Sequence, residues 1–199
     1  MEKIGNGESE RIELIFIEST MKKNRKGGVK KIVITGAEST GKTRLAKDLA
    51  IHYGSVWIPE FARGYIESIN RPYTYNDVES IAKEQIVLEE KIEVKATDFV
   101  FFDTWLIITK IWFDEVYNKV PLWLDKHIAK SKIDLFLVCE NDIEWKPDPV
   151  RENRNKRAYL QSRYIGEIEK TGSPWKLITG IGVERLNNAI ISIDQFFGY

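Results

Sequence analysis

The feature that most constrains this chain is a glycine-rich segment that lies between a β-branched run and an amphipathic run. Residues 31–35 read Lys-Ile-Val-Ile-Thr, residues 36–43 read Gly-Ala-Glu-Ser-Thr-Gly-Lys-Thr, and a helical pattern begins at Arg44. A strand, then G-x-x-x-x-G-K-T, then a helix is the order that a phosphate-binding loop requires. The sequence therefore predicts that the chain binds ATP or GTP.

The residue types in this segment indicate separate roles. Its two glycines let the backbone turn tightly and bring N–H groups up to phosphate oxygens, and the following helix adds its positive end. The Lys42 ammonium can reach the β- and γ-phosphates, and the Thr43 hydroxyl can coordinate Mg²⁺. We expect the nucleotide to contact Gly36, Glu38, Ser39, Thr40, Gly41, Lys42, Thr43 and Arg44.

Strand and helix patterns alternate along the rest of the chain. Strands are expected at about 31–35, 55–58, 99–102, 133–139 and 175–178. Helices are expected at about 42–52, 61–69, 76–95, 104–118, 121–130, 156–171 and 183–196. This alternation predicts a three-layer α/β fold, with a five-stranded parallel sheet and helices on both faces.

The bulk composition favours one domain and argues against nucleic acid and membranes as partners. We expect residues 1–29 to form an extension that ends in a basic linker, and residues 30–199 to form one domain. Thirty basic and thirty acidic residues leave no net charge, so we expect neither nucleic acid nor a membrane as a partner. Cys139 is the single cysteine and favours a reducing compartment. We expect a cytoplasmic protein whose oligomeric state is open.

Two carboxylates follow strands at the edge of the sheet where ligands bind in such folds. Glu60 follows the second strand and can orient a hydroxyl group and accept its proton, with Arg63 one helical turn further on. Asp103 ends the third strand, the position of a carboxylate that holds Mg²⁺ together with Thr43. The alternatives are that Glu60 only favours a helix start beside Arg63, and that Asp103 is a helix N-cap.

The segment after the fourth strand carries arginines and a tryptophan. Arg151, Arg154 and Arg157 recur at three-residue spacing, so on a helix they share one side. We expect them to form a lid that neutralises charge on the transferred phosphoryl group, the alternative being a solvated basic helix start. Trp145 can stack on a flat cationic ring, or it can close the edge of the core. Residues 179–182 can lie against adenine or simply begin a helix.

Taken together, these motifs resemble the ribosylnicotinamide (nicotinamide riboside) kinase domain of the NadR type, within the P-loop kinases. The resemblance covers about residues 30–197 in the same order. The matching segments are residues 36–43, 57–66, 82–85, 102–106, 142–145 and 149–152. The Pro-Glu-Phe-Ala-Arg run within residues 57–66 makes the resemblance much narrower than the phosphate loop alone.

The resemblance implies an activity and a substrate. It implies ATP- and Mg²⁺-dependent phosphorylation of the ribose 5′-hydroxyl of nicotinamide riboside, which gives nicotinamide mononucleotide in NAD salvage. It implies substrate contacts from Glu60, Arg63, Asp103, Trp105 and Trp145, although Trp105 stands where an acidic residue is expected in many relatives. The family often carries an adenylyltransferase domain ahead of the kinase. Residues 1–29 are too short for one, so we expect no second catalytic step.

Other nucleotide-binding classes fit less well. A GTPase needs Asn-Lys-x-Asp, and the nearest string, residues 155–158, lacks the aspartate. A transporter ATPase needs a glycine-rich signature segment, which is missing from the sequence. A thymidylate or deoxynucleoside kinase shares the expected fold and lid, and it stays open as the second interpretation. A non-catalytic ATP-binding regulatory module is disfavoured because Lys42, Thr43, Glu60 and Asp103 are all present.

Overall fold

The computed structural model describes residues 28–93, 98–148, 151 and 153–199. Most of the expected N-terminal extension, residues 1–27, therefore lies outside the described residues. So do Pro149, Val150 and Glu152 of the last segment that carries the family resemblance.

Five parallel strands form one sheet, as the alternating pattern predicted. The order across the sheet is β2-β3-β1-β4-β5, so the strand before the phosphate loop is central. The strands are β1 (Lys30–Thr35), β2 (Val56–Ile58), β3 (Phe99–Asp103), β4 (Leu135–Cys139) and β5 (Trp175–Ile178). The β1–β3 register pairs Ile34 with Asp103, so backbone pairing alone brings the Asp103 carboxylate beside the start of the loop.

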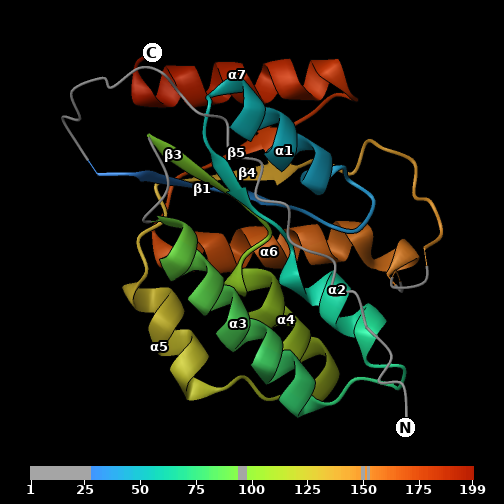
Figure 1. Cartoon of the computed structure of the whole chain (residues 1–199). Coiled ribbons are helices and arrows are strands. Elements are labelled where there is room, and N and C mark those ends of the chain that lie inside the picture. The colour runs from blue at the N-terminus through green and yellow to red at the C-terminus, as the bar shows by residue number, and fades with distance from the viewer. Residues whose placement is uncertain (1–27, 94–97, 149–150, 152) are drawn as a thin grey trace, which may run out of the picture.

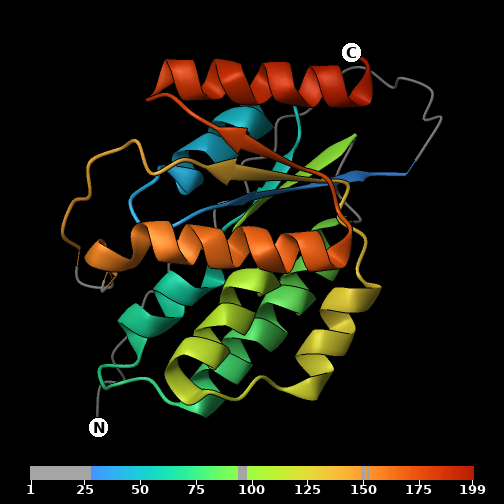
Figure 2. The ribbon, with the colours of Figure 1, turned by 180° about the vertical axis from the view of Figure 1, so that it is seen from behind.

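Helices cover both faces of the sheet and complete the three layers (Figures 1 and 2). One face carries α1 (Lys42–His52) and α7 (Val183–Phe197). The other carries α3 (Tyr75–Glu93), α4 (Leu106–Tyr117), α5 (Leu122–Lys130) and α6 (Arg157–Thr171). The short helix α2 (Phe61–Ser68) follows β2 on this second side.

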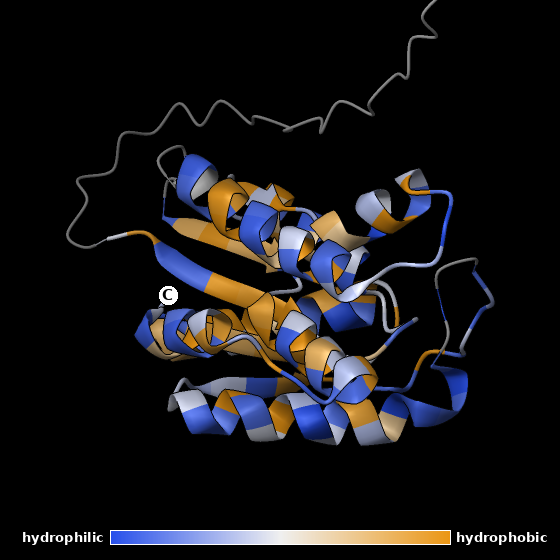
Figure 3. Ribbon diagram, turned by 90° about the horizontal axis from the view of Figure 1, so that it is seen from below, coloured by the Kyte–Doolittle hydropathy of each residue, from blue (hydrophilic) through white to orange (hydrophobic). Residues whose placement is uncertain are grey.

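Alternation along each strand divides the core into two apolar layers. Successive side chains point to opposite faces of a strand. Ile32 and Ile34 therefore pack with Leu49 of α1 and Ile193 of α7, whereas Val33 packs on the other side with Leu106. Figure 3 shows the consequence, because the strands in the middle are hydrophobic and the helices turn hydrophilic residues outward. No helix among the described residues is long and apolar enough to cross a membrane.

The expected helix at 104–118 begins later than the sequence suggested. Thr104 has a φ of 69°, in the left-handed region, which an α-helix does not accept, and α4 starts at Leu106 with Trp105 as its N-cap residue. Asp103 is consequently not the N-cap of α4. Asp103 is the last residue of β3, and its carboxylate does not cap a helix.

Candidate active site

The phosphate loop leaves the central strand β1 and leads into α1. Gly36 has a φ of 139°, and a Cβ atom there would lie 2.8 Å from the Cys139 carbonyl oxygen. Because that neighbour is backbone, only glycine fits where the start of the loop meets the end of β4. Gly41 also has a positive φ, of 78°, as the chain enters α1.

Two side chains of the loop bond to its own backbone. The Thr40 hydroxyl donates to the Ala37 carbonyl oxygen at 2.8 Å. The Lys42 ammonium donates to the same oxygen at 2.9 Å. Lys42 therefore bends back over the loop, which holds its charge beside the backbone that would surround a phosphate.

Asp103 lies buried beside this loop. Its residue is only 1% exposed, and Oδ1 has no hydrogen-bond partner among the described residues. Burial and the negative charge of Glu60 raise the pKa of Asp103 to about 6, and a hydrogen bond from Thr43 and the charge of Lys42 act in the opposite direction. An unpartnered carboxylate oxygen beside a hydroxyl group offers the hard oxygen ligands that Mg²⁺ prefers.

The Asp103→Asn variant tests this burial effect on stability. Because the pKa is raised, the folded protein holds the Asp103 proton more tightly than the unfolded chain between about pH 4 and pH 6. The free energy of unfolding of the wild type therefore falls as the pH rises through this window, and that of the variant does not. We expect the variant to be more stable at pH 7 by about 1–3 kcal/mol, and equal near pH 4.

Urea unfolding at both pH values, without Mg²⁺ or nucleotide, measures this difference. Asp98→Asn is the matched control, because Asp98 is exposed and precedes the same strand. The control should leave the free energy of unfolding nearly unchanged at both pH values. The prediction is contradicted if the free energies of unfolding of Asp103→Asn and wild type differ by the same amount at pH 4 and pH 7.

Glu60 and Arg63 come from the turn after β2. Glu60 precedes α2 in an extended backbone conformation, and its charge acts on both Asp103 and Arg63. The Arg63 guanidinium donates to both carboxylate oxygens of Asp148, at 3.0 and 3.1 Å. Arg63 thus ties α2 to the segment between β4 and α6, while Glu60 stays at the carboxyl end of β2, on the same edge of the sheet as Asp103.

The β4–α6 segment is fastened to the phosphate loop by hydrogen bonds. The Glu38 carboxylate accepts from the Asn153 backbone N–H at 3.0 Å and from its side-chain amide at 2.9 Å. It also accepts from the Trp145 indole at 3.4 Å. The Lys146 backbone N–H donates to the Ser39 hydroxyl at 3.1 Å. Trp145 is therefore held against the loop rather than in the hydrophobic core.

The three arginines do not share one side of a helix, so that prediction is wrong. Arg154 begins a short 3₁₀ turn, Arg157 begins α6, and Arg151 precedes both. Arg151 donates to the Lys146 carbonyl oxygen at 2.8 Å, and the Arg154 guanidinium lies 5.5 Å from the centre of the Trp145 ring. Arg151 lies outside both helical segments, so the regular three-residue spacing cannot place all three side chains on one helical side.

Arg157 differs from the other two arginines. Its Nε and Nη2 atoms are buried and have no hydrogen-bond partner among the described residues. Burial lowers the pKa of Arg157, and the carboxylates of Asp142, Glu140 and Glu38 act in the opposite direction. Buried guanidinium donors without a partner are costly unless an anion satisfies them. Among the described residues, Arg157 is therefore the one of these three arginines with buried donors that remain unpaired.

Comparison with known proteins identifies the family. The model of the AAA_28 family, described as AAA domain, matches residues 31–185. The chain belongs to this AAA domain family. The match runs from the strand before the phosphate loop to the start of α7, and so includes Glu60, Asp103 and Arg157.

Relatives of this AAA domain include NAD biosynthesis proteins. The trifunctional NAD biosynthesis/regulator protein NadR of Salmonella typhimurium is 24% identical over 127 residues, which are 62% of this chain and 31% of NadR. Crystal structures of NadR with nicotinamide riboside (NR), and with NAD and AMP-PNP, have TM-scores of 0.74 and 0.70 at 23% and 22% identity. Both alignments cover 86% of this chain. They cover 52% of the NadR chain in the structure with NR and 50% of the chain in the structure with NAD and AMP-PNP. This chain thus spans about half the length of these NadR structures, and the match to the Salmonella protein covers 31% of that protein.

The same fold occurs in another class of kinase. Thymidylate kinase from Candida albicans has a TM-score of 0.60 at 13% identity, over 86% of this chain and 93% of its own. At these identities the likeness shows the fold alone. This AAA domain therefore has the fold of P-loop nucleoside and nucleotide kinases.

Two sequence-predicted residues of this AAA domain lie away from the loop interior. Trp105 is 2% exposed, donates to Glu89 at 3.2 Å and packs edge-on against Phe136. It packs within the core, and its expected contact with substrate stays a prediction. The sequence signal for the burial of Trp105 was its position in a nearly continuous apolar run. Arg44 is exposed and pairs with Asp48 at 2.6 Å, and its contact with nucleotide stays a prediction.

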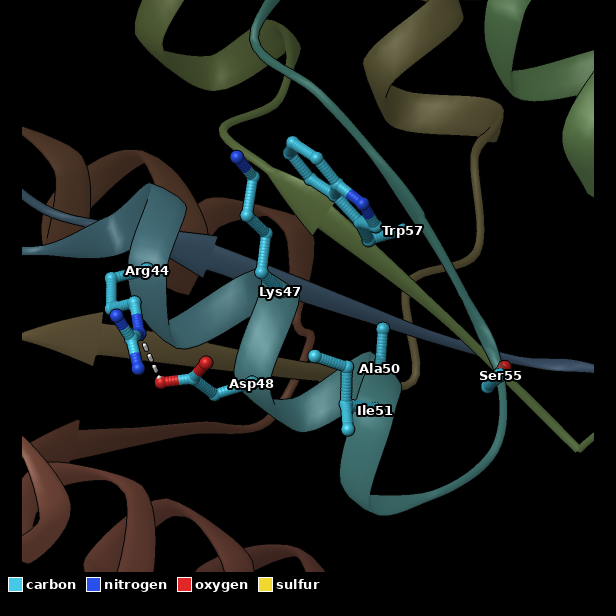
Figure 4. Close-up of a pocket in the computed structure, with 7 residues that line it drawn as sticks. All are labelled: Arg44, Lys47, Asp48, Ala50, Ile51, Ser55 and Trp57. Atoms are coloured by element: carbon cyan, nitrogen blue, oxygen red, sulfur yellow. Dashed lines mark hydrogen bonds and ion pairs between the residues drawn. The ribbon is translucent and has the colours of Figure 1, made fainter. Parts of the chain in front are cut away.

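Two hollows lie beside α1: one of about 260 Å³ next to β2, and one of about 530 Å³ next to the start of α7. Figure 4 shows the smaller one, where Lys47 lies over Trp57 with 4.9 Å between the ammonium and the ring centre. Neither hollow is lined by residues 36–43, so both are separate from the phosphate loop.

Arg185 was missed from the sequence. It is only 3% exposed and bonds to the phosphate loop through the Thr40 carbonyl oxygen. Ala189 and Ile193 follow it at four-residue spacing and are fully buried, which places Arg185 on the inner face of α7. A charged residue in phase with an apolar helix face was the signal that could have revealed it.

Proposed function

We propose that the chain is an ATP-dependent kinase that phosphorylates the ribose 5′-hydroxyl of nicotinamide riboside, with residues 30–199 as the kinase domain. The observation that carries the proposal is the meeting of three groups at one edge of the sheet. These are a phosphate loop with Lys42 and Thr43, the buried Asp103 carboxylate, and Glu60 close enough to raise the pKa of Asp103. A phosphoryl donor site beside two carboxylates suits transfer to an alcohol.

In this proposal the loop binds ATP and the surrounding side chains handle charge and protons. The backbone N–H groups and Lys42 hold the β- and γ-phosphates. Glu60 orients the ribose hydroxyl group and accepts its proton as the new P–O bond forms. Arg157, whose buried donors lack a partner, neutralises charge that spreads over the transferred group.

The residues present also fit Mg²⁺. Thr43 and Asp103 would hold the ion, because Asp103 Oδ1 is buried with no hydrogen-bond partner in the described part of the chain and a hydrogen bond links the two side chains. No group of three or more His, Cys, Asp or Glu side chains within the described ranges could hold a metal ion. Mg²⁺ with phosphates needs only one or two protein ligands. When bound, it would neutralise charge on the phosphate oxygens.

The surroundings of Trp145 favour a substrate with a flat, positively charged ring. Its indole is held by Glu38, and the planar Arg154 cation already lies over its ring. The nicotinamide ring of nicotinamide riboside is also planar and cationic, and an aromatic face attracts such a group. The NadR structure in complex with NR is a relative that binds this nucleoside.

A nucleoside panel tests the proposal. Purified protein with ATP and Mg²⁺ should phosphorylate nicotinamide riboside with a higher kcat/KM than nicotinic acid riboside, thymidine or thymidylate. Trp145→Leu keeps an apolar contact and loses the attraction of the ring for a cation. The preference for nicotinamide riboside over thymidine should therefore narrow by about 0.5–2 kcal/mol, or roughly 2- to 30-fold.

Trp123→Leu is the control for this panel. Trp123 is a half-buried tryptophan of α5 whose indole donates to Glu79, so the same chemical change falls outside the site. The preference of Trp123→Leu for nicotinamide riboside over thymidine should match that of the wild type. If the wild type phosphorylates thymidine or thymidylate and ignores nicotinamide riboside, the pyrimidine kinase interpretation replaces ours. That interpretation is the second candidate because thymidylate kinase shares the fold.

A further inference from the structure

Arg185 joins three loops at the edge of the sheet. Its Nη1 donates to the Thr40 carbonyl oxygen in the phosphate loop. Its Nε donates to the Gly180 carbonyl oxygen in the β5–α7 loop at 2.7 Å. Its Nη2 donates to the Glu140 carbonyl oxygen, just after β4, at 3.2 Å, and pairs with the Asp142 carboxylate. One buried side chain thus holds the backbone of three separate segments.

Asp142 completes this arrangement from the other side. While one carboxylate oxygen pairs with Arg185, the other accepts the Gly180 backbone N–H at 2.7 Å. Gly180 has a φ of 94°, and a Cβ there would lie 3.1 Å from the Arg185 backbone nitrogen. The three residues therefore form one packed unit in which Gly180 is bonded through both its N–H and its C=O.

The bond to Thr40 has a direct consequence for phosphate binding. The peptide unit that contains the Thr40 carbonyl also contains the Gly41 N–H, and a trans peptide is planar with these two groups pointing in opposite directions. When Arg185 holds the carbonyl oxygen, it also fixes the direction of the Gly41 N–H. Backbone N–H groups of this loop are the groups that a phosphate would meet.

Lysine cannot replace arginine in this position. A guanidinium group presents donors in a rigid planar fork, whereas an ammonium group is a compact charge on a flexible stem. Three carbonyl oxygens and a carboxylate at different angles require the fork. Arg185→Lys would keep the charge and release part of this arrangement.

We propose that Arg185 is a positioning residue for nucleotide binding, which sets the Thr40–Gly41 peptide of the phosphate loop from outside the loop. The inference rests on the proposed function, since it concerns the same nucleotide site. It predicts that Arg185 affects nucleotide affinity although all three of its guanidinium nitrogens already donate to protein groups. Asp142 supports Arg185 by balancing its buried charge.

Titration of purified Arg185→Lys with MgADP, below its unfolding temperature, tests the inference. We expect the Kd for MgADP to rise about tenfold over wild type, because hydrogen bonds from a charged donor that orient the loop are lost. Arg163→Lys is the matched control. Arg163 pairs with both Asp114 and Glu115 at 2.6 Å, and so it ties α6 to α4 by the same fork without contacting the three loops. This control should lower the melting temperature and leave the Kd unchanged.

The outcomes separate positioning from stability. A wild-type Kd in folded Arg185→Lys overturns the inference even if its melting temperature falls. If Arg185→Lys does not fold, Asp142→Asn is titrated instead, where a weaker Kd supports the inference and a wild-type Kd overturns it. MgADP binding needs no nucleoside, so a failure to phosphorylate nicotinamide riboside leaves this test valid. Failure of the wild type to bind MgADP overturns the proposed function itself.

Discussion

Lys42→Ala is expected to lower kcat for phosphoryl transfer by about 10²–10³-fold, with the fold retained. The Lys42 ammonium lies over the phosphate loop, 2.9 Å from the Ala37 carbonyl oxygen, where a transferring phosphoryl group would be surrounded by fixed donors. A positive charge in such a preorganised site stabilises the transition state more strongly than it would in water. Steady-state kinetics with nicotinamide riboside and ATP measure the effect, and thermal unfolding checks the fold.

Lys47→Ala is the matched control for this measurement. Lys47 lies on the same helix, is exposed, and lies over Trp57 rather than over the loop. The charge of Lys47 makes only a minor contribution to the pKa of Asp103. The kcat of Lys47→Ala should therefore differ from that of the wild type by less than about threefold. Turnover in Lys42→Ala equal to that of Lys47→Ala would remove Lys42 from the catalytic set.

Under the proposed function Glu60 is the general base, so Glu60→Gln should lower kcat by about 10²–10⁴-fold for every nucleoside that is phosphorylated. Glutamine keeps the size of the side chain and can still accept a hydrogen bond, but it cannot take up the proton of the ribose hydroxyl group. The KM for ATP should change little, since ATP binds at the loop. Rates measured with several nucleosides distinguish a lost base from a lost substrate contact.

Glu67→Gln provides the comparison. Glu67 belongs to α2, the short helix that Glu60 precedes. It is exposed and pairs with Arg63 at 3.4 Å. It should retain near wild-type kcat. Normal turnover in Glu60→Gln together with an inactive Asp103→Asn would assign the proton acceptor to Asp103 and contradict our assignment.

The parts of the site that follow from local rules could be predicted from the sequence. A G-x-x-x-x-G-K-T run specifies its own turn. Short apolar runs locate the strands and period-3.6 patterns locate the helices, to within about two residues. The ends of neighbouring parallel strands meet at one edge, so Glu60 and Asp103 could be placed near Lys42 before the fold was known. These predictions needed no knowledge of distant contacts.

Other parts depend on contacts between residues far apart in the chain. The partners of Arg185 lie at Thr40, Glu140 and Gly180, and spacing along the sequence cannot reveal such a convergence. Trp105 directly follows Asp103, and this position alone does not reveal which way its indole points. The left-handed conformation of Thr104 turns the chain, and the indole enters the core. The common side expected for the arginines failed because helical structure begins only at Arg154, which leaves Arg151 outside it.

The pairing of Ile34 with Asp103 has a consequence for redesigning this fold. The position of the Asp103 carboxylate is set by main-chain hydrogen bonding between two central strands, and α3 supports the same region through Gln85, which donates to the Thr104 carbonyl oxygen. Under the proposed function, an engineer could rebuild the exposed residues of α2 to admit a different alcohol while the phosphate loop and its carboxylate keep their spacing. Acceptor range and transfer chemistry would then be specified by different levels of structure.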